Sequence, residues 1–354
     1  MSKKFKIKIS PVKKLRIRTV LFIGAFWTAI DFVIFLLDPN LRLEKRTLWA
    51  REIFMFCLSL FMGYLIVFRM KKFLRRHALW MNFLTKSVIL VVSALVVTFI
   101  VQFFTLVVVN GQTINYAFND IYAYATHKNW IIDKLVYWIS IFFVTQLILI
   151  INEKYSPGVF FDILIGKYIR PKVENRIIMF MDLKDSTPIA EKLGHNRYFE
   201  FITEFIYLLS LAIIEFEGTI YQYVGDEIVC SWKNTEKNTS RCLDTIIQSR
   251  KNIQKKSAYF KRKFGIVPDF RVGINVGEVT IGEIGVLKKD LAMSGDTMNT
   301  TARIRSACTE LNRHYIVSKE FVGASQLKGW QTESLGLVDL KGKDEKIELF
   351  ALKI

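Results

Sequence analysis

The sequence predicts two parts: a membrane α-helical domain with four transmembrane helices, and an α+β domain with a mostly antiparallel sheet and flanking helices. Three observations support this prediction. The first half contains four long apolar runs, and the second half alternates short apolar runs with amphipathic stretches. The charge is also uneven, because residues 1–152 hold 20 of the 50 Lys and Arg but only 6 of the 32 Asp and Glu.

The overall composition excludes a disordered chain, since 51% of the 354 residues are hydrophobic and the mean hydropathy is +0.26. A formal charge of +18 would by itself suggest a nucleic-acid partner. The basic excess lies in the apolar half, however, where membrane topology explains it. We therefore expect contact with a lipid bilayer and no nucleic-acid binding. The four cysteines form no CxxC pair, so neither a disulfide framework nor a zinc site is indicated.

The four apolar runs are residues 19–37, 50–68, 87–109 and 133–151, each near the length of about 20 residues that a helix needs to span a bilayer. The third run carries no charge. The first contains a single acid, Asp31, for which the sequence identifies no partner. We see neither paired intramembrane charges nor broken helices of the kind that a channel or transporter would need.

The loops between the runs predict the orientation in the membrane. The tail at 1–18 has eight basic residues and no acid, and the segment 69–86 has six basic residues and no acid. The loop at 38–49 has mixed charges, and the loop at 110–132 holds one Lys and one Asp. The positive-inside rule then makes the tail and the middle loop cytoplasmic, and four spans return the C-terminal half to the cytoplasm. The chain is expected in the plasma or inner membrane.

Four segments follow from these patterns: a basic tail (1–18), a transmembrane domain (19–151), a linker (152–175) and an α+β domain (176–354). In the last segment, RIIMFMDL is a buried strand and Pro188 suits the first turn of a helix. Further helices are expected at 196–216, 238–263 and 296–308, hairpins at 218–232 and 270–285, and short strands in the tail from residue 336.

Two carboxylates are the strongest chemical signal from single residues. Asp182 ends an apolar strand, and Asp226 lies in the tight turn of the first hairpin. Carboxylates at strand ends that face a common edge can hold the Mg²⁺ ions used in phosphoryl transfer. Taken alone the pair is weak evidence, because Gly-Asp is also common turn chemistry.

Five motifs change that balance: MFMDLKDST, YQYVGDE, FRVGINVGEV, SGDTMNTTARI and LKGK occur in this order. Together they resemble the catalytic domain of class III nucleotide cyclases, the adenylate and guanylate cyclases, over about residues 176–354. The apolar half resembles the varied membrane anchors and sensors attached to such domains.

The resemblance implies a role for each matching residue. Asp182 and Asp226, with the backbone carbonyl of Leu183, would bind two Mg²⁺ or Mn²⁺ ions per active site. Arg271 matches a phosphate-contacting arginine, and Lys341 matches a lysine on the β- and γ-phosphates, with Lys343 a poorer candidate.

Two further residues match the helix that opens at GDTMN. Asn299 corresponds to an asparagine that orients the ribose, and Arg303, on the same helix face, to the arginine that stabilises the transition state. In this family, one domain supplies the metal and phosphate residues and a second domain supplies the ribose and transition-state residues. A chain with one such domain is therefore expected to act as a homodimer.

Base recognition departs from the family pattern. Adenylate cyclases usually carry Lys where this chain has Gln222, and Asp, Thr or Ser where it has Ala292; guanylate cyclases usually carry Glu and Cys. The Gln222 amide can donate to adenine N1 and accept from the exocyclic amine, but it can also accept from guanine N1–H. ATP is favoured as the substrate, giving cyclic AMP and diphosphate.

Three alternatives stay open beside this one. The same enzyme could use GTP, or a degenerate domain could act as a nucleotide-binding regulatory dimer. A diguanylate cyclase is disfavoured, because the turn reads VGDEI and SGDTMNTTARI has no place in that family.

Overall fold

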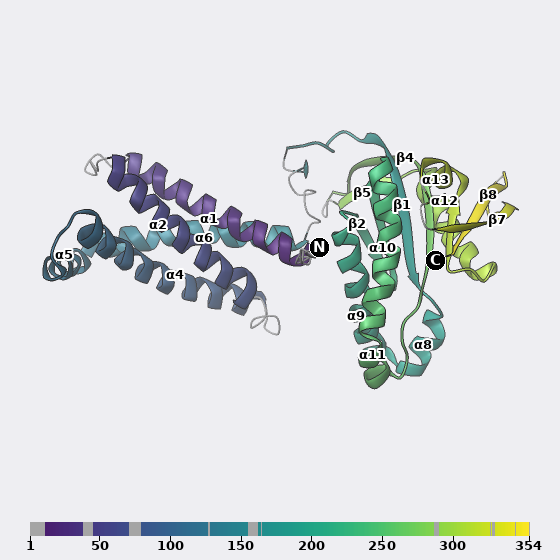
Figure 1. Ribbon diagram of the computed structural model, residues 1–354, viewed down its shortest axis with the longest axis horizontal. Coiled ribbons are helices and arrows are strands. Elements are labelled where there is room, and N and C mark those ends of the chain that lie inside the picture. Colours follow the sequence, from purple (N-terminus) through teal and green to yellow (C-terminus); the bar gives the residue numbers. More distant parts are fainter. Residues whose placement is uncertain are drawn as a thin grey trace, which may run out of the picture. The chain divides into compact units, whose positions relative to one another are not determined.

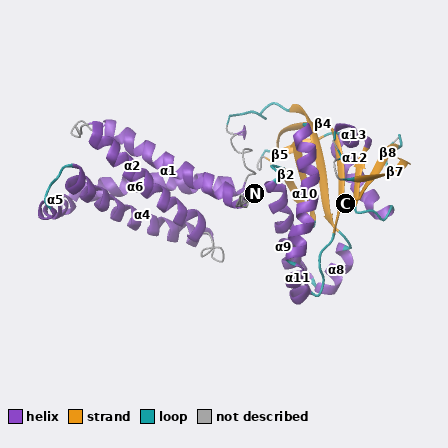
Figure 2. Cartoon of the chain, viewed as in Figure 1, coloured by secondary structure: helices purple, strands orange, loops and turns teal. Residues whose placement is uncertain are grey.

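The computed structural model describes residues 11–37, 45–70, 79–126, 128–154, 162–163, 165–286, 290–325, 327, 330–343 and 345–353. The chain divides into two compact units, residues 1–154 and 155–354 (Figures 1 and 2). Residues 1–10 of the basic tail, residues 71–78 of the basic middle loop, and residues 155–161 of the linker lie outside the described residues.

Apart from the connection at 110–113, the described residues of the first unit are helical. Each predicted apolar run forms a helix: α1 (Pro11–Leu37), α2 (Lys45–Tyr64) continued by the π-helix η1 (Leu65–Met70), α4 (Leu79–Phe104) continued by the π-helix η2 (Thr105–Val109), and α6 (Lys128–Lys154). The segment 110–132, expected to be a loop, also contains a helix, α5 (Ile114–Thr126). That expectation was wrong because the run INYAFNDIYAYAT is amphipathic at helical spacing despite its polar residues.

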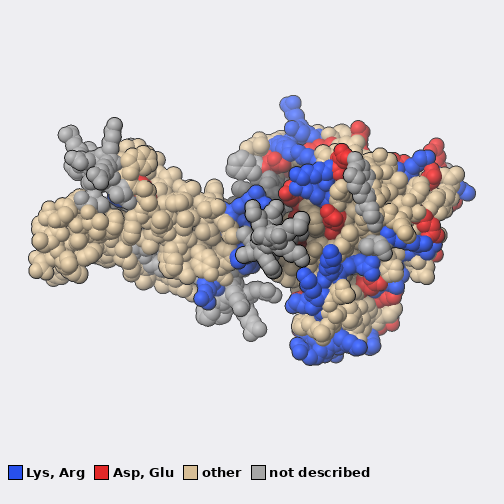
Figure 3. Space-filling view, in the orientation of Figure 1, with Lys and Arg blue, Asp and Glu red and all other residues tan. Residues whose placement is uncertain are grey.

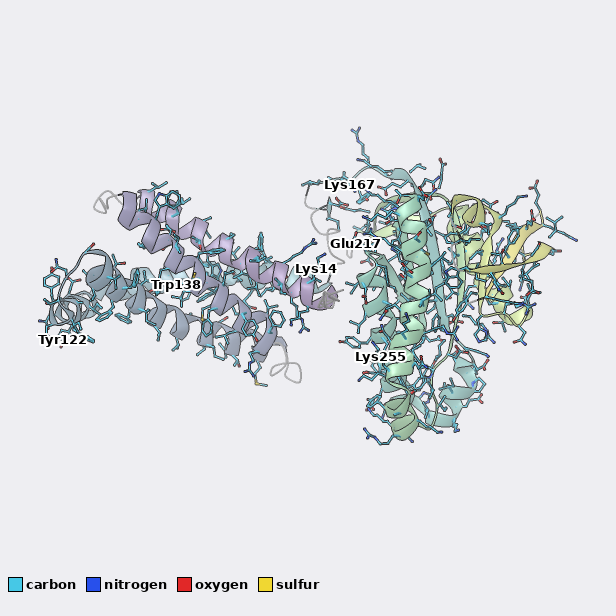
Figure 4. All side chains as sticks on the ribbon, viewed as in Figure 1. Lys14, Tyr122, Trp138, Lys167, Glu217 and Lys255 are labelled. Atoms are coloured by element: carbon cyan, nitrogen blue, oxygen red, sulfur yellow. The ribbon has the colours of Figure 1, made fainter. Side chains whose placement is uncertain are left out.

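Buried aromatic and hydroxyl groups hold the helical unit together. Trp27 on α1 and Trp138 on α6 are 2% and 3% exposed and lie in one apolar cluster. Figure 4 labels Trp138. The indole of Trp27 donates to Thr145 Oγ1 at 2.9 Å, and that of Trp138 donates to Thr98 Oγ1 at 3.0 Å. Buried indole N–H groups need such partners, so these bonds fix which helices meet.

The acid Asp31 of α1 has the partner that the sequence did not reveal. Arg51, in the second turn of α2, contacts Asp31 Oδ2 at 2.7 Å and Glu52 Oε1 at 2.8 Å. No paired intramembrane charges were seen in the sequence, and this pair between two of the predicted spans was missed. The two residues are far apart along the chain, and packing of α1 against α2 joins them. A paired acid costs much less to bury than an isolated one.

Among the described residues, one helical segment passes the length and hydropathy criteria for a membrane span: Arg51–Arg69, with a mean hydropathy of 1.8. Shorter apolar stretches lie at Thr98–Val108 and Val136–Leu149. Many large apolar side chains of the helical unit are exposed, and the face drawn in Figure 3 is almost free of Lys, Arg, Asp and Glu over these helices. Four transmembrane helices thus stay a prediction.

The second unit is an α+β domain on one mixed sheet of eight strands. The strand order is β2-β3-β1-β4-β6-β8-β7, with β5 paired to β4, and β4 with β6 is the parallel pair among those described. The strands are β1 (Lys172–Leu183), β2 (Thr219–Val224), β3 (Glu227–Lys233), β4 (Phe270–Ile284), β5 (Asp290–Ser294), β6 (Tyr315–Ser318), β7 (Gln331–Val338) and β8 (Ile347–Lys353).

The central strand β1 separates two apolar clusters because successive side chains point to opposite faces. Ile177, Met179 and Met181 are fully buried on one face. This main core is covered by helices, of which α9, α10 and α11 lie side by side in Figure 1. The helices of this unit are α8 (Ser186–Leu193), α9 (His195–Glu215), α10 (Glu236–Lys255), α11 (Ser257–Phe264), α12 (Asp296–Glu310) and α13 (Lys319–Ala324).

The opposite face carries Ile178 and Phe180, in a smaller cluster with Met298 and Ala302 of α12. Two glycines of β4 allow α12 to approach this face closely. A Cβ at Gly273 would lie 2.5 Å from the backbone nitrogen of Arg305, and one at Gly277 would lie 2.5 Å from Thr297 Oγ1. The backbone of α12 thus lies directly against the backbone of β4, and this contact places the side chains of α12 near the end of β1.

Two expectations about this unit were wrong in detail. Where a hairpin was expected at 270–285, residues 270–284 form one continuous strand, β4, whose hairpin partner is β5. Gly273 and Gly277 in this strand allow the close approach of α12 instead of forming a turn. In addition, β1 begins at Lys172, inside the segment taken as linker, because β4 is long enough to pair with it from Lys172 onward.

Candidate active site

A row of charged side chains crosses the sheet where β1 ends. Asp182 pairs with Arg271 of β4 in the antiparallel register. On the other side, the β1–β3 register ends at Met181 opposite Ile228, so one further residue brings Glu227 beside Asp182. Asp182 shares the face of Ile178 and Phe180, the one that α12 covers. The strand pattern therefore presents this carboxylate to α12.

Asp226 reaches the same place from the turn between β2 and β3. Gly225 before it has φ +62°, a conformation that favours glycine and lets the chain reverse within two residues. The Asp226 carboxylate lies close enough to Asp182 to contribute to the raised pKa of the Asp182 carboxyl group. Asp226 Oδ2 is buried and has no hydrogen-bond partner among the described residues. A buried carboxylate oxygen left in this way can accept a cation.

Arg305 of α12 adds a cation to this site. Its Nε lies 2.6 Å from Glu227 Oε2, and its Nη1 lies 3.5 Å from Asp182 Oδ2. The side chains of Asp182 and Glu227 are 16% and 10% exposed. On the other flank, Arg271 Nη2 lies 3.5 Å from Asp185 Oδ1.

Burial raises the pKa of Asp182 to about 6. The Arg305 and Arg271 guanidinium groups act in the opposite direction, and the neighbouring Asp226 carboxylate adds to the rise. Burial likewise raises the pKa of Glu227, against the effect of Arg305. Without a bound cation, the ionised forms of Asp182 and Glu227 are therefore disfavoured. A divalent ion at this place would stabilise the ionised carboxylates.

The raised pKa of Asp182 predicts a pH-dependent cost to stability. Between its ordinary value and about pH 6 the folded chain binds more protons than the unfolded chain, so the unfolding free energy falls as the pH rises through this window. We expect Asp182→Asn to raise the thermal unfolding midpoint of the full chain with chelator at pH 7.5, and the gain to shrink at pH 5. The exposed Asp244→Asn is the control. An equal loss of stability at both pH values would contradict this account.

The remaining predicted residues lie around a different side of α12. Arg303 precedes Arg305 by two residues, which turns it by about 200° around the helix. Its Nη1 donates to the carbonyl of Gly342, at 2.8 Å, in the connection between β7 and β8. Asn299, one turn earlier, and Lys341, next to Gly342, are exposed. Lys343 forms an ion pair with Asp296, which leaves Lys341 the freer of the two lysines.

The two residues expected to recognise the base lie on β2 and β5. Gln222 is exposed and follows a bulge in β2, where the register shifts between Ile220 and Gln222. Ala292 pairs with Gly282 of β4. Tyr221, at the bulge, joins the two strands, because its hydroxyl accepts a hydrogen bond from the backbone N–H of Met293 at 2.9 Å. Gln222 directly follows Tyr221, and Ala292 directly precedes Met293, so this hydrogen bond joins the two strands next to both residues.

The structure brings Asp182, Asp226 and Arg271 together and leaves Asn299, Arg303 and Lys341 on another side of α12. Leu183 ends β1 next to Asp182, and its side chain is buried. Among the described residues, no three His, Cys, Asp or Glu side chains converge as a complete metal site. Arg305 and Glu227 were not predicted from the sequence; the available signal for Glu227 was its position directly after Asp226.

Comparison with known proteins agrees with this fold. Residues 169–353 match the family of adenylate and guanylate cyclase catalytic domains. Adenylate cyclase 2 of Rhizobium meliloti is 28% identical over 223 residues, which cover 62% of this chain and 61% of the relative. An adenylate cyclase of Anabaena cylindrica is 24% identical over 216 residues, 57% of this chain and 42% of the relative. The chain therefore spans less than two thirds of these relatives.

Guanylate cyclases also match, such as guanylate cyclase 2G of Mus musculus, 22% identical over 191 residues, 52% of this chain and 17% of the relative. Among solved structures, a bacterial light-regulated adenylyl cyclase aligns with a TM-score of 0.55 at 18% identity, covering 64% of this chain and 67% of that chain. This likeness concerns the fold. Since the matching region takes in more than half of the sequence, this chain belongs to the family of adenylate and guanylate cyclase catalytic domains.

Proposed function

We propose that this protein is a membrane-bound adenylate cyclase, which converts ATP to 3′,5′-cyclic AMP and diphosphate by two-metal-ion catalysis at a homodimer interface. The observation that carries the proposal is the meeting of Asp182 and Asp226, with a buried carboxylate oxygen that has no partner among the described residues. The relatives named adenylate cyclases support the choice of ATP.

The donor set suits Mg²⁺ or Mn²⁺. Both are hard cations that prefer carboxylate and carbonyl oxygens, which Asp182, Asp226 and the Leu183 carbonyl supply. When bound, the two ions lower the pKa of the ribose 3′-hydroxyl and neutralise charge on the triphosphate. With two carboxylates, the protein offers only part of a coordination shell, and the phosphate oxygens of the substrate complete it.

The basic residues divide the work on the substrate. Arg271 lies beside Asp182 in the sheet register and contacts phosphate. Arg303 donates to charge that develops on the α-phosphate, and Asn299 orients the ribose so that the 3′-oxygen faces that phosphorus. Lys341 binds the β- and γ-phosphates. Each residue holds or orients the substrate, and displacement of diphosphate by the 3′-oxygen closes the ring.

Two copies of the chain are needed to bring these groups onto one substrate. Arg303 lies about 200° around α12 from Arg305, which contacts Asp182 of its own chain. A symmetric head-to-tail dimer therefore combines Asp182, Asp226 and Arg271 of one copy with Asn299, Arg303 and Lys341 of the other. Such a dimer contains two equal sites.

Gln222 reads the base in this proposal. Ala292 has no polar side-chain atom, so binding of the wrong base leaves few polar groups of the protein without a hydrogen bond. Discrimination between ATP and GTP is therefore modest. We expect Gln222→Ala to raise KM for ATP and to lower the ATP/GTP ratio of kcat/KM by about tenfold, with a smaller change in kcat. Steady-state rates with ATP and GTP in parallel measure this, with the exposed Gln331→Ala as control.

The same assay tests the competing assignments. A higher kcat/KM for GTP in the wild-type chain would make the protein a guanylate cyclase, and no cyclic product from either nucleotide would favour a regulatory dimer. Unchanged ATP/GTP selectivity in Gln222→Ala would mean that the base is recognised elsewhere.

The helical unit anchors the enzyme in the plasma or inner membrane, with the tail and the catalytic domain in the cytoplasm. Four long helices and a largely apolar exposed surface support this proposal, and the segment Arg51–Arg69 is long and apolar enough to span the bilayer. Anchoring confines the copies to one plane and raises their effective concentration, which favours the dimer.

A further inference from the structure

Arg305 has no role in the reaction assigned above, yet it lies inside the acidic site. The two arginines of α12 contact different groups: Arg303 donates to the Gly342 carbonyl, and Arg305 contacts Glu227 and Asp182. The position of Arg305 is set by the backbone, because α12 approaches β4 so closely at this residue that only glycine fits at position 273. Arg305 is therefore built into the site by the fold.

The contacts of Arg305 are unequal. Its Nε is 2.6 Å from Glu227, and its Nη1 is 3.5 Å from Asp182. Glu227 attracts the guanidinium to one side by charge, without a hydrogen bond between Arg305 Nε and Glu227 Oε2, while the positive charge still reaches Asp182. A guanidinium at this distance attracts the Asp182 carboxylate and repels any second cation that approaches it.

The net charge of the site also indicates weak binding of free divalent cations. Asp182, Asp226 and Glu227 with Arg305 carry a formal charge of −2, and Arg271 lies next to them in the register. No three acidic, His or Cys side chains among the described residues form a complete metal site. The protein alone is a poor ligand for two divalent ions, whereas a triphosphate would bring about four further negative charges and more oxygen ligands.

We propose that Arg305 is a built-in counter-ion of the metal-free site, which weakens the binding of free divalent cations so that they enter together with the nucleoside triphosphate. Glu227 is the positioning residue that keeps this guanidinium from closing fully on Asp182. The inference rests on the proposed function, since it takes Asp182 and Asp226 as the metal carboxylates.

The test is binding of Mn²⁺ alone to the purified full-length chain without nucleotide, followed by the electron paramagnetic resonance signal of free Mn²⁺. Arg305→Gln removes the repulsive charge and should tighten Mn²⁺ binding by about tenfold. Glu227→Gln frees the guanidinium toward Asp182 and should weaken binding. Arg305→Lys keeps the charge and should stay near wild type. Arg313→Gln, which breaks an ion pair with Glu333 on other elements, is the matched control.

Weaker or unchanged Mn²⁺ binding by Arg305→Gln would overturn the inference. If Arg305→Gln does not fold, as judged by thermal unfolding, tighter or unchanged binding by Glu227→Gln would overturn it instead. Asp182→Asn distinguishes a failure of the role given to Arg305 from a failure of the metal assignment. Loss of Mn²⁺ binding in Asp182→Asn with no effect of Arg305→Gln leaves the proposed function standing, whereas no loss in Asp182→Asn means that the metal assignment itself has failed.

Discussion

Alanine at Asp182 or at Asp226 should each abolish cyclisation, lowering turnover by roughly a thousandfold or more. Asp182 and Asp226 are the two carboxylates proposed to bind the ions, and Asp226 Oδ2 has no hydrogen-bond partner among the described residues. The third acid of the site, Glu227, is paired with Arg305, so removing Asp182 or Asp226 leaves one carboxylate for two ions, which cannot hold both at fixed positions. Rates with ATP and saturating Mn²⁺ measure the effect.

The fold should survive both changes. Asp182 is a buried acid whose charge costs stability at neutral pH, so its loss should not lower the unfolding midpoint. Asp244→Ala, an exposed acid of α10, serves as the control and should retain full turnover. Near-normal turnover in either Asp182→Ala or Asp226→Ala would refute the two-metal assignment.

Co-expression of two inactive variants should restore activity. Asp182→Ala lacks a metal carboxylate, and Arg303→Ala lacks the guanidinium of the transition state. In the proposed head-to-tail dimer each site takes Asp182 from one copy and Arg303 from the other, so in a mixed dimer one site would carry both changes and the other neither. With random pairing about half of the dimers are mixed, so membranes should recover roughly a quarter of wild-type activity.

The matched control for this experiment is co-expression of Asp182→Ala with Asp226→Ala. Both changes affect the set of residues that one copy contributes, so every site in their mixed dimers still lacks one carboxylate. We expect no recovery there. Recovery in the control equal to that of the first pair would mean that something other than shared sites restores activity.

The strands that position the site could be predicted because their burial pattern is local. RIIMFMDL is apolar throughout, and in β1 it lies between a main core on one face and the α12 cluster on the other. The turn at Gly225 was visible in the sequence because a left-handed conformation at this position favours glycine. β4 was harder, since Gly273 and Gly277 look like turn residues until α12 is known to press against them.

The parts of the site that the sequence did not reveal depend on contacts between distant segments. Glu227 and Arg305 are 78 positions apart in the sequence, and the close crossing of α12 over β4 brings them to 2.6 Å. The ion pair of Asp31 with Arg51 has the same cause in the helical unit, where α1 packs against α2. Local sequence patterns predict which residues are candidates, and tertiary packing decides which of them meet.

The most direct test of the account is the turnover of a purified mixed dimer. Asp182→Ala and Arg303→Ala copies that carry different affinity tags are co-expressed, and two successive affinity steps isolate the dimers that contain one of each. Because such a dimer has one intact site of two, its turnover of ATP to cyclic AMP should be about half that of the wild-type dimer. An inactive mixed dimer would show that each copy builds its own site, and would contradict the account.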